Sequence, residues 1–378
     1  MSHIPFNRVS WTGNESTYLD RAVASGHLSG SGPFTQLAES MIENLLGKKN
    51  LLTTSCTHAL EIAALLLKSE SDDRDEVIVP AFTFVSTASA FALHGYRVRF
   101  ADVSESDLNI SPTSIESILS DRTRAICTVN YAGRSCDYES IRRLVGDRQI
   151  ALIEDNAHGF GGVIDGKRLG TFGDLATHSF HETKNVSCGE GGNIVFRDPK
   201  YFELAEILRE KGTNRGRFLR GQVDKYTWVE IGSSWVVSDL LAAVLVGQLE
   251  RLEDITKRRT KIYTAYKLGL KSWAEDQEVL LPPDDSSAMH TSHMFFLRLK
   301  NLECRTRLIE HLRMRDINAV FHYQALNASP VGQRLGGQVG ACPVSEKYSD
   351  TLVRLPLYES LSEQDVERVI EGVISFAT

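Results

Sequence analysis

The sequence lacks the features that mark several classes of protein. Its six cysteines, at positions 56, 127, 136, 188, 304 and 342, form neither a C-x-x-C pair nor the Cys/His spacing of a metal site, so we expect free, buried thiols. The net charge is −7 and no basic run is present, which argues against nucleic-acid binding. The longest apolar run, residues 240–246, is far too short to span a bilayer, and residues 1–8 lack the pattern of a signal peptide. We therefore expect a cytoplasmic protein with neither nucleic acid nor membrane as a partner.

The length and the periodicity of the chain predict an α/β protein with two domains. A chain of 378 residues exceeds the usual limit of one hydrophobic core, so we expect a large domain at 1–250, beginning with a helical segment, and a small domain at 251–378. Helix-like and strand-like segments alternate through the large domain, which predicts a mostly parallel, covered sheet. Its seven expected strands are 51–52, 77–79, 98–100, 125–129, 150–154, 177–180 and 193–196.

The second part of the chain has a different pattern. Beyond residue 201 it is mainly helical, with a long helical stretch expected from 238 to about 268. The C-terminal part mixes both patterns and predicts a smaller α+β unit. Its expected strands are 294–299, 319–323 and 353–355, and its expected helices are 305–313 and 363–374.

Lys184 is the first candidate catalytic residue. It follows an apolar, strand-like run (175–180) and precedes Asn185 and the glycine-rich loop 189–192, so we expect it at a strand end. A buried lysine loses its proton readily, and the neutral amine condenses with a carbonyl group such as an aldehyde cofactor. The alternative is an ordinary surface lysine.

Asp155 supplies the matching half of this site. It follows the apolar run 150–153, which places it at the carboxyl end of a buried strand, where open α/β sheets bind ligands. A carboxylate there holds a pyridine nitrogen protonated and makes the ring an electron sink. The alternative is a helix cap. Taken together, Lys184 and Asp155 predict a site for pyridoxal 5'-phosphate.

Three further features fit the same cofactor. Ser55, Cys56 and Thr57 lie where a loop becomes a helix, which is an anion site for a phosphate group, although the same residues are ordinary N-cap chemistry. Phe82 follows a strand and could stack on a planar ring, or simply pack beside its neighbours. His158 could touch the ring or its phenolic oxygen, or serve as a capping or core histidine.

Six motifs in this order give the chain, over nearly its whole length, a resemblance to the nucleotide-sugar aminotransferases of the DegT/StrS class. These are SCTHAL (55–60), PAFTF (80–84), EDNAHG (154–159), SFHETK (179–184), GEGG (189–192) and LPL (355–357). The resemblance implies the aspartate-aminotransferase fold, which is pyridoxal phosphate fold type I. It also implies a homodimer with shared active sites.

The resemblance further implies a role for individual residues. Lys184 would form the Schiff base with pyridoxal 5'-phosphate, and Asp155 would pair with its ring nitrogen. Phe82 and His158 would flank the ring. The phosphate would be bound by the cup containing Cys56 and Thr57 and by Ser179. An intact Lys184 favours transamination over dehydration.

Two departures from the general family pattern narrow the resemblance. In the phosphate cup, Cys56 replaces the family's usual glycine. The family's usual Gly-x-Asn-x-Arg motif is replaced by residues 232–236, in which Ser234 takes the place of the asparagine. The resemblance therefore leaves Ser234 to contact the cofactor phosphate across the dimer. These departures, with segments 180–185, 210–215, 220–228 and 319–323, resemble the subgroup that transfers the amino group of L-glutamate to C4 of dTDP-4-keto-6-deoxyglucose. One subgroup motif, Pro-Leu-His, is replaced here by 325–327. The implied product is a dTDP-4-amino-4,6-dideoxyhexose for cell-surface polysaccharide such as lipopolysaccharide O-antigen.

Several alternatives stay open at this point. The enzyme could act at C3 of a dTDP-3-keto-6-deoxyhexose, or the chain could be a non-catalytic relative that binds sugar nucleotides. A cysteine-dependent acyl transferase would use Cys56 at a helix N-terminus. His322 and Tyr323 are candidate sugar contacts or core residues. Candidate pyrophosphate or subunit contacts, with plain surface charge as the alternative, are Arg134, Arg215, Arg217, Arg220 and Lys225.

Overall fold

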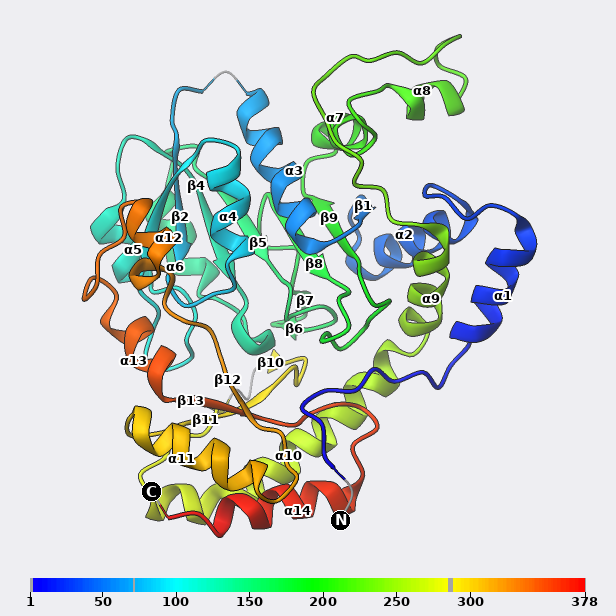
Figure 1. The fold of residues 1–378 in the computed structure, drawn as a ribbon. Helices are drawn as coiled ribbons and strands as arrows, with labels where there is room; N and C mark the ends of the chain where they lie inside the picture. The colour runs from blue at the N-terminus through cyan, green and yellow to red at the C-terminus, as the bar shows by residue number, and fades with distance from the viewer. Residues whose placement is uncertain (1–2, 71, 285–287, 378) are drawn as a thin grey trace.

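A seven-stranded sheet forms the centre of the larger part of the molecule in the computed structural model, which describes residues 3–70, 72–284 and 288–377 (Figure 1). The strand order is β1-β9-β8-β5-β4-β2-β3, and only β9 runs antiparallel to its neighbours. The mostly parallel seven-stranded sheet predicted from the sequence is therefore confirmed. Its strands are β1 (Asn50–Thr53), β2 (Glu76–Pro80), β3 (Arg97–Ala101), β4 (Thr123–Val129), β5 (Ala151–Asp155), β8 (Leu175–Ser179) and β9 (Gly192–Phe196).

Helices cover both faces of this sheet because successive strand residues point to opposite sides. Val77 and Val79 of β2 pack with α3 (Cys56–Ser69) and α4 (Ser86–Leu93), whereas Ile78 packs on the other face with α5 (Pro112–Ile118) and α6 (Tyr138–Val145). On that second face, β1, β8 and β9 are covered by α2 (Pro33–Leu46) and α9 (Asp239–Leu249). The continuous apolar runs of the strands reflect this burial on both sides.

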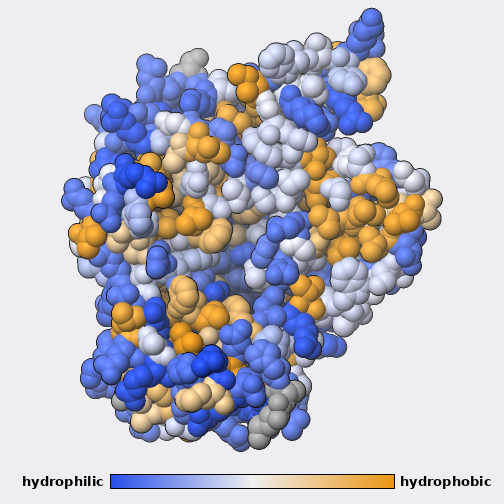
Figure 2. Space-filling model, in the orientation of Figure 1, coloured by the Kyte–Doolittle hydropathy of each residue, from blue (hydrophilic) through white to orange (hydrophobic). Residues whose placement is uncertain are grey.

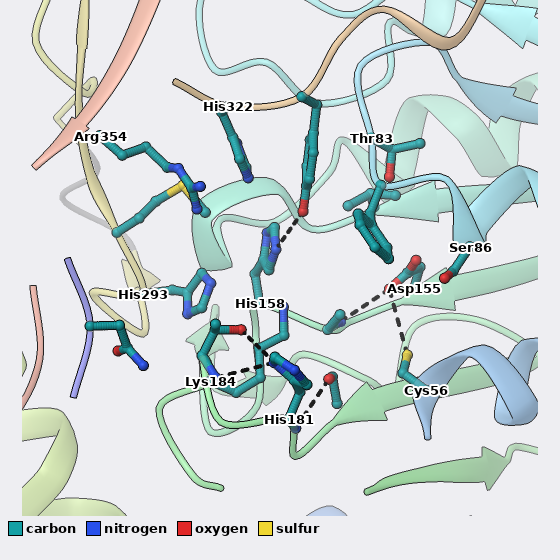
Figure 3. Close-up of a pocket in the computed structure, with 18 of the residues that line it drawn as sticks. Cys56, Thr83, Ser86, Asp155, His158, His181, Lys184, His293, His322 and Arg354 are labelled. Carbon is teal, nitrogen blue, oxygen red and sulfur yellow. Dashed lines mark hydrogen bonds between the residues drawn. The ribbon is translucent and has the colours of Figure 1, made fainter. Parts of the chain in front are cut away.

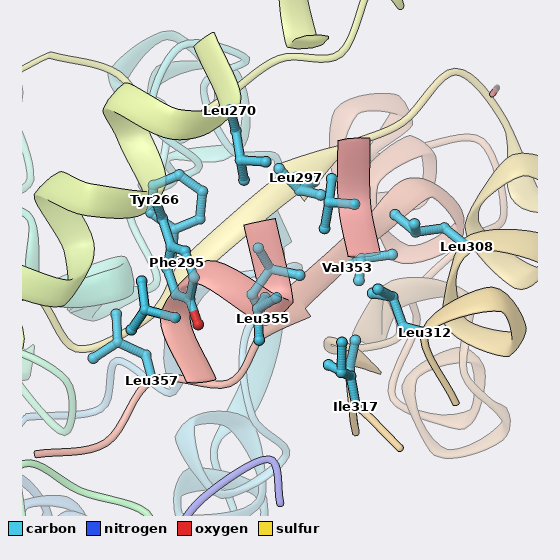
Figure 4. Packing of buried hydrophobic residues seen from close by; sticks show 14 of the residues in the cluster. Tyr266, Leu270, Phe295, Leu297, Leu308, Leu312, Ile317, Val353, Leu355 and Leu357 are labelled. Carbon is cyan, nitrogen blue, oxygen red and sulfur yellow. The ribbon is translucent and has the colours of Figure 1, made fainter. Parts of the chain in front are cut away.

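A second, antiparallel sheet organises the C-terminal part. Its order is β11-β13-β12, formed by Phe295–Arg298, Leu352–Leu355 and Val320–Phe321. Apolar side chains of this sheet pack against α10 (Leu252–Asp276), α11 (Leu302–Arg313) and α14 (Glu363–Ile374), as Figure 4 shows. Ile4 joins the same core and pairs with Ile317, so the start of the chain lies on the C-terminal part. The domain division at 250/251 falls between α9 and α10 and stays a prediction.

Some elements differ from the sequence-based expectation. The helical stretch expected over 238–268 is two helices, α9 and α10, which are separated at Glu250 and Arg251. A small sheet, β10-β6-β7, was not predicted, because its strands (Ala288–Met289, Val163–Ile164, Lys167–Arg168) have only two residues each and no readable period. The remaining helices are α1 (Glu15–Ser25), α7 (Lys200–Arg209), α8 (Arg215–Leu219), α12 (Pro330–Arg334) and α13 (Pro343–Thr351).

The carboxyl ends of the central strands lie where the two parts of the molecule meet. β5 ends at Asp155 and β8 ends at Ser179, while β1 leads into the start of α3 at Cys56. In Figure 1 the sheet β11-β13-β12, called the small antiparallel sheet from here on, lies below this region. Figure 2 shows that the surface is hollowed between the two parts. The fold thus places the predicted motifs around one opening.

The described residues contain neither a helix that could span a membrane nor a cluster that could hold a metal ion. No helix in the described part of the chain is long and apolar enough to cross a bilayer. The same residues contain no group of three or more His, Cys, Asp or Glu side chains arranged to hold a metal ion. All six cysteines are free thiols, and Cys56 is the one that is partly exposed.

Candidate active site

A cavity of about 710 Å³ lies between the central sheet and the small antiparallel sheet (Figure 3). It has the size of a cofactor or small-ligand site. Residues from both parts of the molecule line it. Nine residues that the sequence analysis names as candidates line this cavity: Ser55, Cys56, Thr57, Asp155, His158, Ser179, Lys184, His322 and Tyr323.

Lys184 projects into the cavity from the turn that follows β8. Its backbone N–H donates a hydrogen bond to the backbone carbonyl oxygen of His181 at 2.9 Å. Burial of the side chain lowers the pKa of Lys184 to about 8, and the negative charge of Asp155 opposes this shift. About a tenth of the amine is therefore unprotonated at pH 7, far more than for an ordinary lysine, and the unprotonated form is the nucleophile.

Asp155 is held in a fixed orientation at the end of β5. Its Oδ2 accepts a hydrogen bond from the Thr87 hydroxyl at 2.7 Å, and its Oδ1 accepts one from the Ala157 backbone N–H at 3.2 Å. Burial raises the pKa of Asp155 above its ordinary value, whereas these two hydrogen bonds and the positive charge of Lys184 lower it. A positively charged ring nitrogen in the cavity would stabilise the carboxylate further.

Hydroxyl groups gather at the N-terminus of α3. Thr57 Oγ1 lies 2.7 Å from Ser86 Oγ, and Ser55 caps the helix by accepting the His58 N–H at 3.2 Å. Cys56 and Thr57 are the first two helical residues, so their amide groups have no acceptor within the helix. Hydroxyls and free amides at a helix N-terminus form a binding site for an anion such as a phosphate.

Gly192, the last residue of the glycine-rich loop, lies against the phosphate cup formed by Ser55, Cys56 and Thr57. A Cβ atom at Gly192 would lie 2.4 Å from the Cys56 backbone nitrogen and 2.5 Å from the Ser55 carbonyl carbon. Glycine therefore allows β9 to approach the start of α3 closely. Any other residue would displace the phosphate cup.

The surroundings of Cys56 disfavour a nucleophilic thiol. Its Sγ lies 3.5 Å from Thr177 Oγ1 and 4.0 Å from Asp155 Oδ1. Burial, followed by the charge of Asp155, raises the pKa of Cys56 well above its ordinary value. A reactive cysteine needs the opposite shift, which counts against the acyl transferase alternative.

Neutral histidines and tyrosines form the wall of the cavity opposite the cup. His158 Nε2 and the Tyr323 hydroxyl lie 3.1 Å apart, and the His158 ring stacks on His293 with centroids 4.4 Å apart. His322 Nδ1 lies 2.6 Å from the Tyr131 hydroxyl. Burial lowers the pKa values of all three histidines, so they are uncharged near neutral pH.

Phe82, which the resemblance places against the cofactor ring, is not among the residues that line the cavity, and its role stays a prediction. Phe82 is 1% exposed and packs against Tyr131 and Tyr323. Phe84 lines it instead and is 55% exposed. Both phenylalanines follow β2 two residues apart, so the sequence alone could not show which ring reaches the ligand.

Ser234 does not reach the cavity of its own chain. It is exposed, lies on the segment that follows α8, and pairs with Glu210 at the end of α7. Its contact with a second subunit stays a prediction. The arginines of the same region form ion pairs within the chain, because Arg215, Arg217 and Arg220 pair with Glu210, Glu203 and Glu206 respectively.

His293 and Arg354 are among the cavity residues that sequence reasoning missed. The signal for Arg354 was its place directly before the LPL motif. His293 is tied to the lysine loop by Asn185, whose Oδ1 lies 2.9 Å from His293 Nδ1 and whose Nδ2 donates to the Thr291 carbonyl at 2.7 Å. These bonds link the lysine loop to the C-terminal part of the chain.

The arrangement fits pyridoxal phosphate. One cavity contains a lysine with a lowered pKa, a buried carboxylate without a basic partner among the described residues, and a hydroxyl-rich helix N-terminus. These supply the attachment point, the partner for the ring nitrogen and the phosphate site. The fold and the site thus define a pyridoxal-phosphate-dependent enzyme.

Comparisons with known proteins agree. Residues 10–374 match the model of the DegT/DnrJ/EryC1/StrS aminotransferase family. The chain is 29% identical over 350 residues to the uncharacterised protein MJ1066 of Methanocaldococcus jannaschii, covering 90% of this chain and 89% of that protein. The aminotransferase TlmJ of Streptoalloteichus hindustanus has a TM-score of 0.90 at 28% identity, covering 99% and 98% of the two chains.

A second solved structure shows the same fold. The PLP-form of Spr1654 from Streptococcus pneumoniae, a putative sugar aminotransferase, has a TM-score of 0.90 at 23% identity, covering 99% of this chain and 98% of that one. The chain belongs to the DegT/DnrJ/EryC1/StrS aminotransferase family. It is a transaminase that depends on pyridoxal phosphate.

The lowered pKa of Lys184 predicts how cofactor attachment depends on pH. As the pH rises through about 8, the neutral amine fraction grows, so the rate at which the apoenzyme takes up pyridoxal phosphate should rise with a midpoint near 8. Asp155→Asn should move this midpoint lower, because the carboxylate favours the charged amine. Stopped-flow absorbance of the lysine-bound cofactor measures the rate.

The exposed Lys257 offers a matched control for this experiment. Lys257→Ala should leave the midpoint unchanged, whereas Lys184→Ala should abolish the absorbance. A midpoint above 10, the range of an ordinary lysine, would contradict the buried site.

Proposed function

We propose that the enzyme transfers the amino group of L-glutamate to C4 of dTDP-4-keto-6-deoxy-D-glucose, giving a dTDP-4-amino-4,6-dideoxyhexose. The observation that carries the reaction type is the pairing, in one cavity, of an amine with a pKa of about 8 and a buried carboxylate. The choice of sugar is supported by the motifs of the C4-specific subgroup. His322 and Tyr323 line the same cavity, in position to contact a bound sugar.

Each residue then has a separate task. When bound, pyridoxal phosphate supplies an aldehyde for the donor amine and a ring that accepts the electrons of the Cα–H bond. Thr57, Ser179 and the first amides of α3 hold its phosphate. Asp155 keeps the ring nitrogen protonated, and His158 and Phe84 enclose the ring.

Lys184 acts as both attachment point and proton carrier. With the donor bound, the free Lys184 amine would take the proton from Cα of the donor and deliver it to C4′ of the cofactor. In the second half of the cycle it would take a proton back from C4′ and deliver it to C4 of the sugar. A pKa of about 8 suits this work, because a catalytic base is most effective when its pKa lies near the working pH.

The alternatives differ in how well they agree with this site. An intact lysine and carboxylate in one cavity count against a non-catalytic relative that only binds sugar nucleotides. Amination at C3 of a dTDP-3-keto-6-deoxyhexose would use the same residues, so the position of the new amine has to be measured.

We also infer that the active enzyme is a homodimer with shared sites. α8 and the loop after it, residues 215–234, stand away from the rest of the chain in Figure 1. On this arm the side chains of Trp228 and Ile231 are 73% and 74% exposed. Apolar side chains also gather over α1, α2 and α9 in Figure 2, where Val23 and Leu37 are exposed. A second copy of the chain would bury both surfaces and would bring Ser234 toward the partner's phosphate site.

Product analysis tests the proposed substrate. The protein is incubated with pyridoxal phosphate, L-glutamate and dTDP-4-keto-6-deoxyglucose, and the product is examined by NMR. We expect an amino group at C4, and the coupling between H3 and H4 will separate the galacto from the gluco product. Lys184→Ala should lower turnover by about 100-fold or more, because the proton carrier is gone.

Lys257→Ala serves again as the control and should retain full turnover. If the sugar is recovered unchanged while L-glutamate alone still converts the cofactor to its pyridoxamine form, the assignment as an aminotransferase stands. The proposed sugar substrate is then rejected. A product with its amine at C3 would favour the alternative position.

Mixing two inactive variants tests the shared site. Ser234→Glu should lose most of its activity, because the new carboxylate would repel the partner's cofactor phosphate. When Ser234→Glu and Lys184→Ala are unfolded and refolded together, about a quarter of wild-type activity should return, since half of the dimers are mixed and each has one intact site. Mixed dimers that form without any recovery of activity would contradict the shared site.

A further inference from the structure

Tyr131 and His322 form a hydrogen-bonded pair at the wall of the cavity. Tyr131 follows β4 of the central sheet, and His322 follows β12 of the small antiparallel sheet. The Tyr131 hydroxyl lies 2.6 Å from His322 Nδ1, and no second partner of this hydroxyl is found in the described part of the chain. His322 also stacks on Tyr323, with ring centroids 3.6 Å apart. The imidazole ring is therefore fixed both at Nδ1 and on one face.

The burial of Tyr131 decides which member of this pair donates the hydrogen bond. Tyr131 is 0% exposed, and burial raises its pKa well above the ordinary value, so its hydroxyl stays protonated. If His322 donated through Nδ1, the hydroxyl hydrogen of Tyr131 would be buried without an acceptor among the described residues, which is costly. The arrangement that pairs this hydrogen has Tyr131 donating to Nδ1. The neutral ring of His322 then carries its own hydrogen on Nε2.

The second ring nitrogen of His322 faces the cavity. His322 lines the cavity, and Figure 3 shows its ring pointing into it. Its Nε2 has no hydrogen-bond partner in the part of the chain that the structure describes, and the protein does not fully enclose this atom. Burial, followed by the positive charge of Arg354, lowers the pKa of His322 well below its ordinary value, so the ring is neutral. His322 thus presents one uncharged N–H donor to a ligand.

An uncharged donor suits an uncharged oxygen of the ligand. A keto sugar carries neutral hydroxyl and carbonyl oxygens, whereas every oxygen of L-glutamate belongs to a charged carboxylate, which a cation binds more strongly than a neutral N–H does. We propose that Tyr131 is a positioning residue that fixes the hydrogen of His322 on Nε2, and that this N–H donates to a hydroxyl or carbonyl oxygen of the keto sugar. This inference rests on the proposed function, because it presupposes a keto sugar as the amino acceptor.

The position of the hydrogen on His322 is measured in the apoenzyme. Protein with isotope-labelled histidine is examined by two-bond nitrogen–proton correlation NMR, which distinguishes a ring nitrogen that carries hydrogen from one that does not. His322→Gln assigns the signal by removing it. We expect hydrogen on Nε2 in the wild type and a mixture of both tautomers in Tyr131→Phe. Hydrogen on Nδ1 in the wild type would overturn the inference, and this spectrum decides even if Tyr131→Phe fails to fold.

The two half-reactions separate a contact with the sugar from a general structural effect. The pyridoxal form of each variant is mixed with L-glutamate and the pyridoxamine form with the keto sugar, and the cofactor absorbance is followed. We expect Tyr131→Phe to raise the apparent KM for the sugar by about 3- to 10-fold, the effect of one weakened hydrogen bond, and to leave the reaction with L-glutamate unchanged.

Tyr266→Phe is the matched control for this measurement. Tyr266 is also 0% exposed, and its hydroxyl donates one hydrogen bond to the Pro356 carbonyl at 2.8 Å, but it does not line the cavity. This variant should behave as wild type in both half-reactions. An equal rise of the KM for L-glutamate and for the sugar in Tyr131→Phe would show a structural effect and contradict the inference.

A double variant shows whether Tyr131 acts through His322. The amide of glutamine always carries N–H donors, so in His322→Gln no tautomer is left for Tyr131 to fix. Tyr131→Phe should therefore cause no further rise of the sugar KM in this background, and a further rise of the same size would contradict the inference. Wild-type enzyme that reacts with L-glutamate but not with the keto sugar would instead reject the proposed substrate, while the NMR spectrum still decides the role of Tyr131.

Discussion

The enclosure of Lys184 is the constraint on which the rest of the site depends. Burial disfavours the ammonium form and lowers the pKa of this lysine to about 8. A close carboxylate partner would cancel this effect, and the structure avoids one by binding Asp155 through Thr87 and Ala157. The amine and the carboxylate therefore share one cavity while each remains available to a different part of a ligand.

Enclosure of this kind requires both parts of the molecule. The central sheet contributes the lysine, the carboxylate and the phosphate cup, while the small sheet contributes Arg354 and the segment with His322 and Tyr323. Asn185 joins the two parts directly, because it bonds to Thr291 and His293 immediately beside Lys184. Movement of the small sheet would thus change the surroundings of the lysine as well as the sugar side of the cavity.

The parts of the fold that local sequence determines could be predicted. Strands β2, β4 and β5 were visible because both faces are buried and their runs are apolar, and Lys184 and Asp155 were found because they follow such runs. Features that depend on contacts between distant residues could not be read in this way. Phe82 and Phe84 differ only in which neighbours they meet, and Arg354 reaches the cavity only because β13 pairs between β11 and β12.

The most direct test of the account is to locate the covalent attachment of the cofactor. Wild-type protein loaded with pyridoxal phosphate is reduced with sodium borohydride, which fixes the lysine-bound cofactor as a stable amine, and the digested protein is analysed by mass spectrometry. The account predicts one reduced cofactor on the peptide that contains Lys184 and none in Lys184→Ala. A label on another lysine, or bound cofactor without any label, would contradict it.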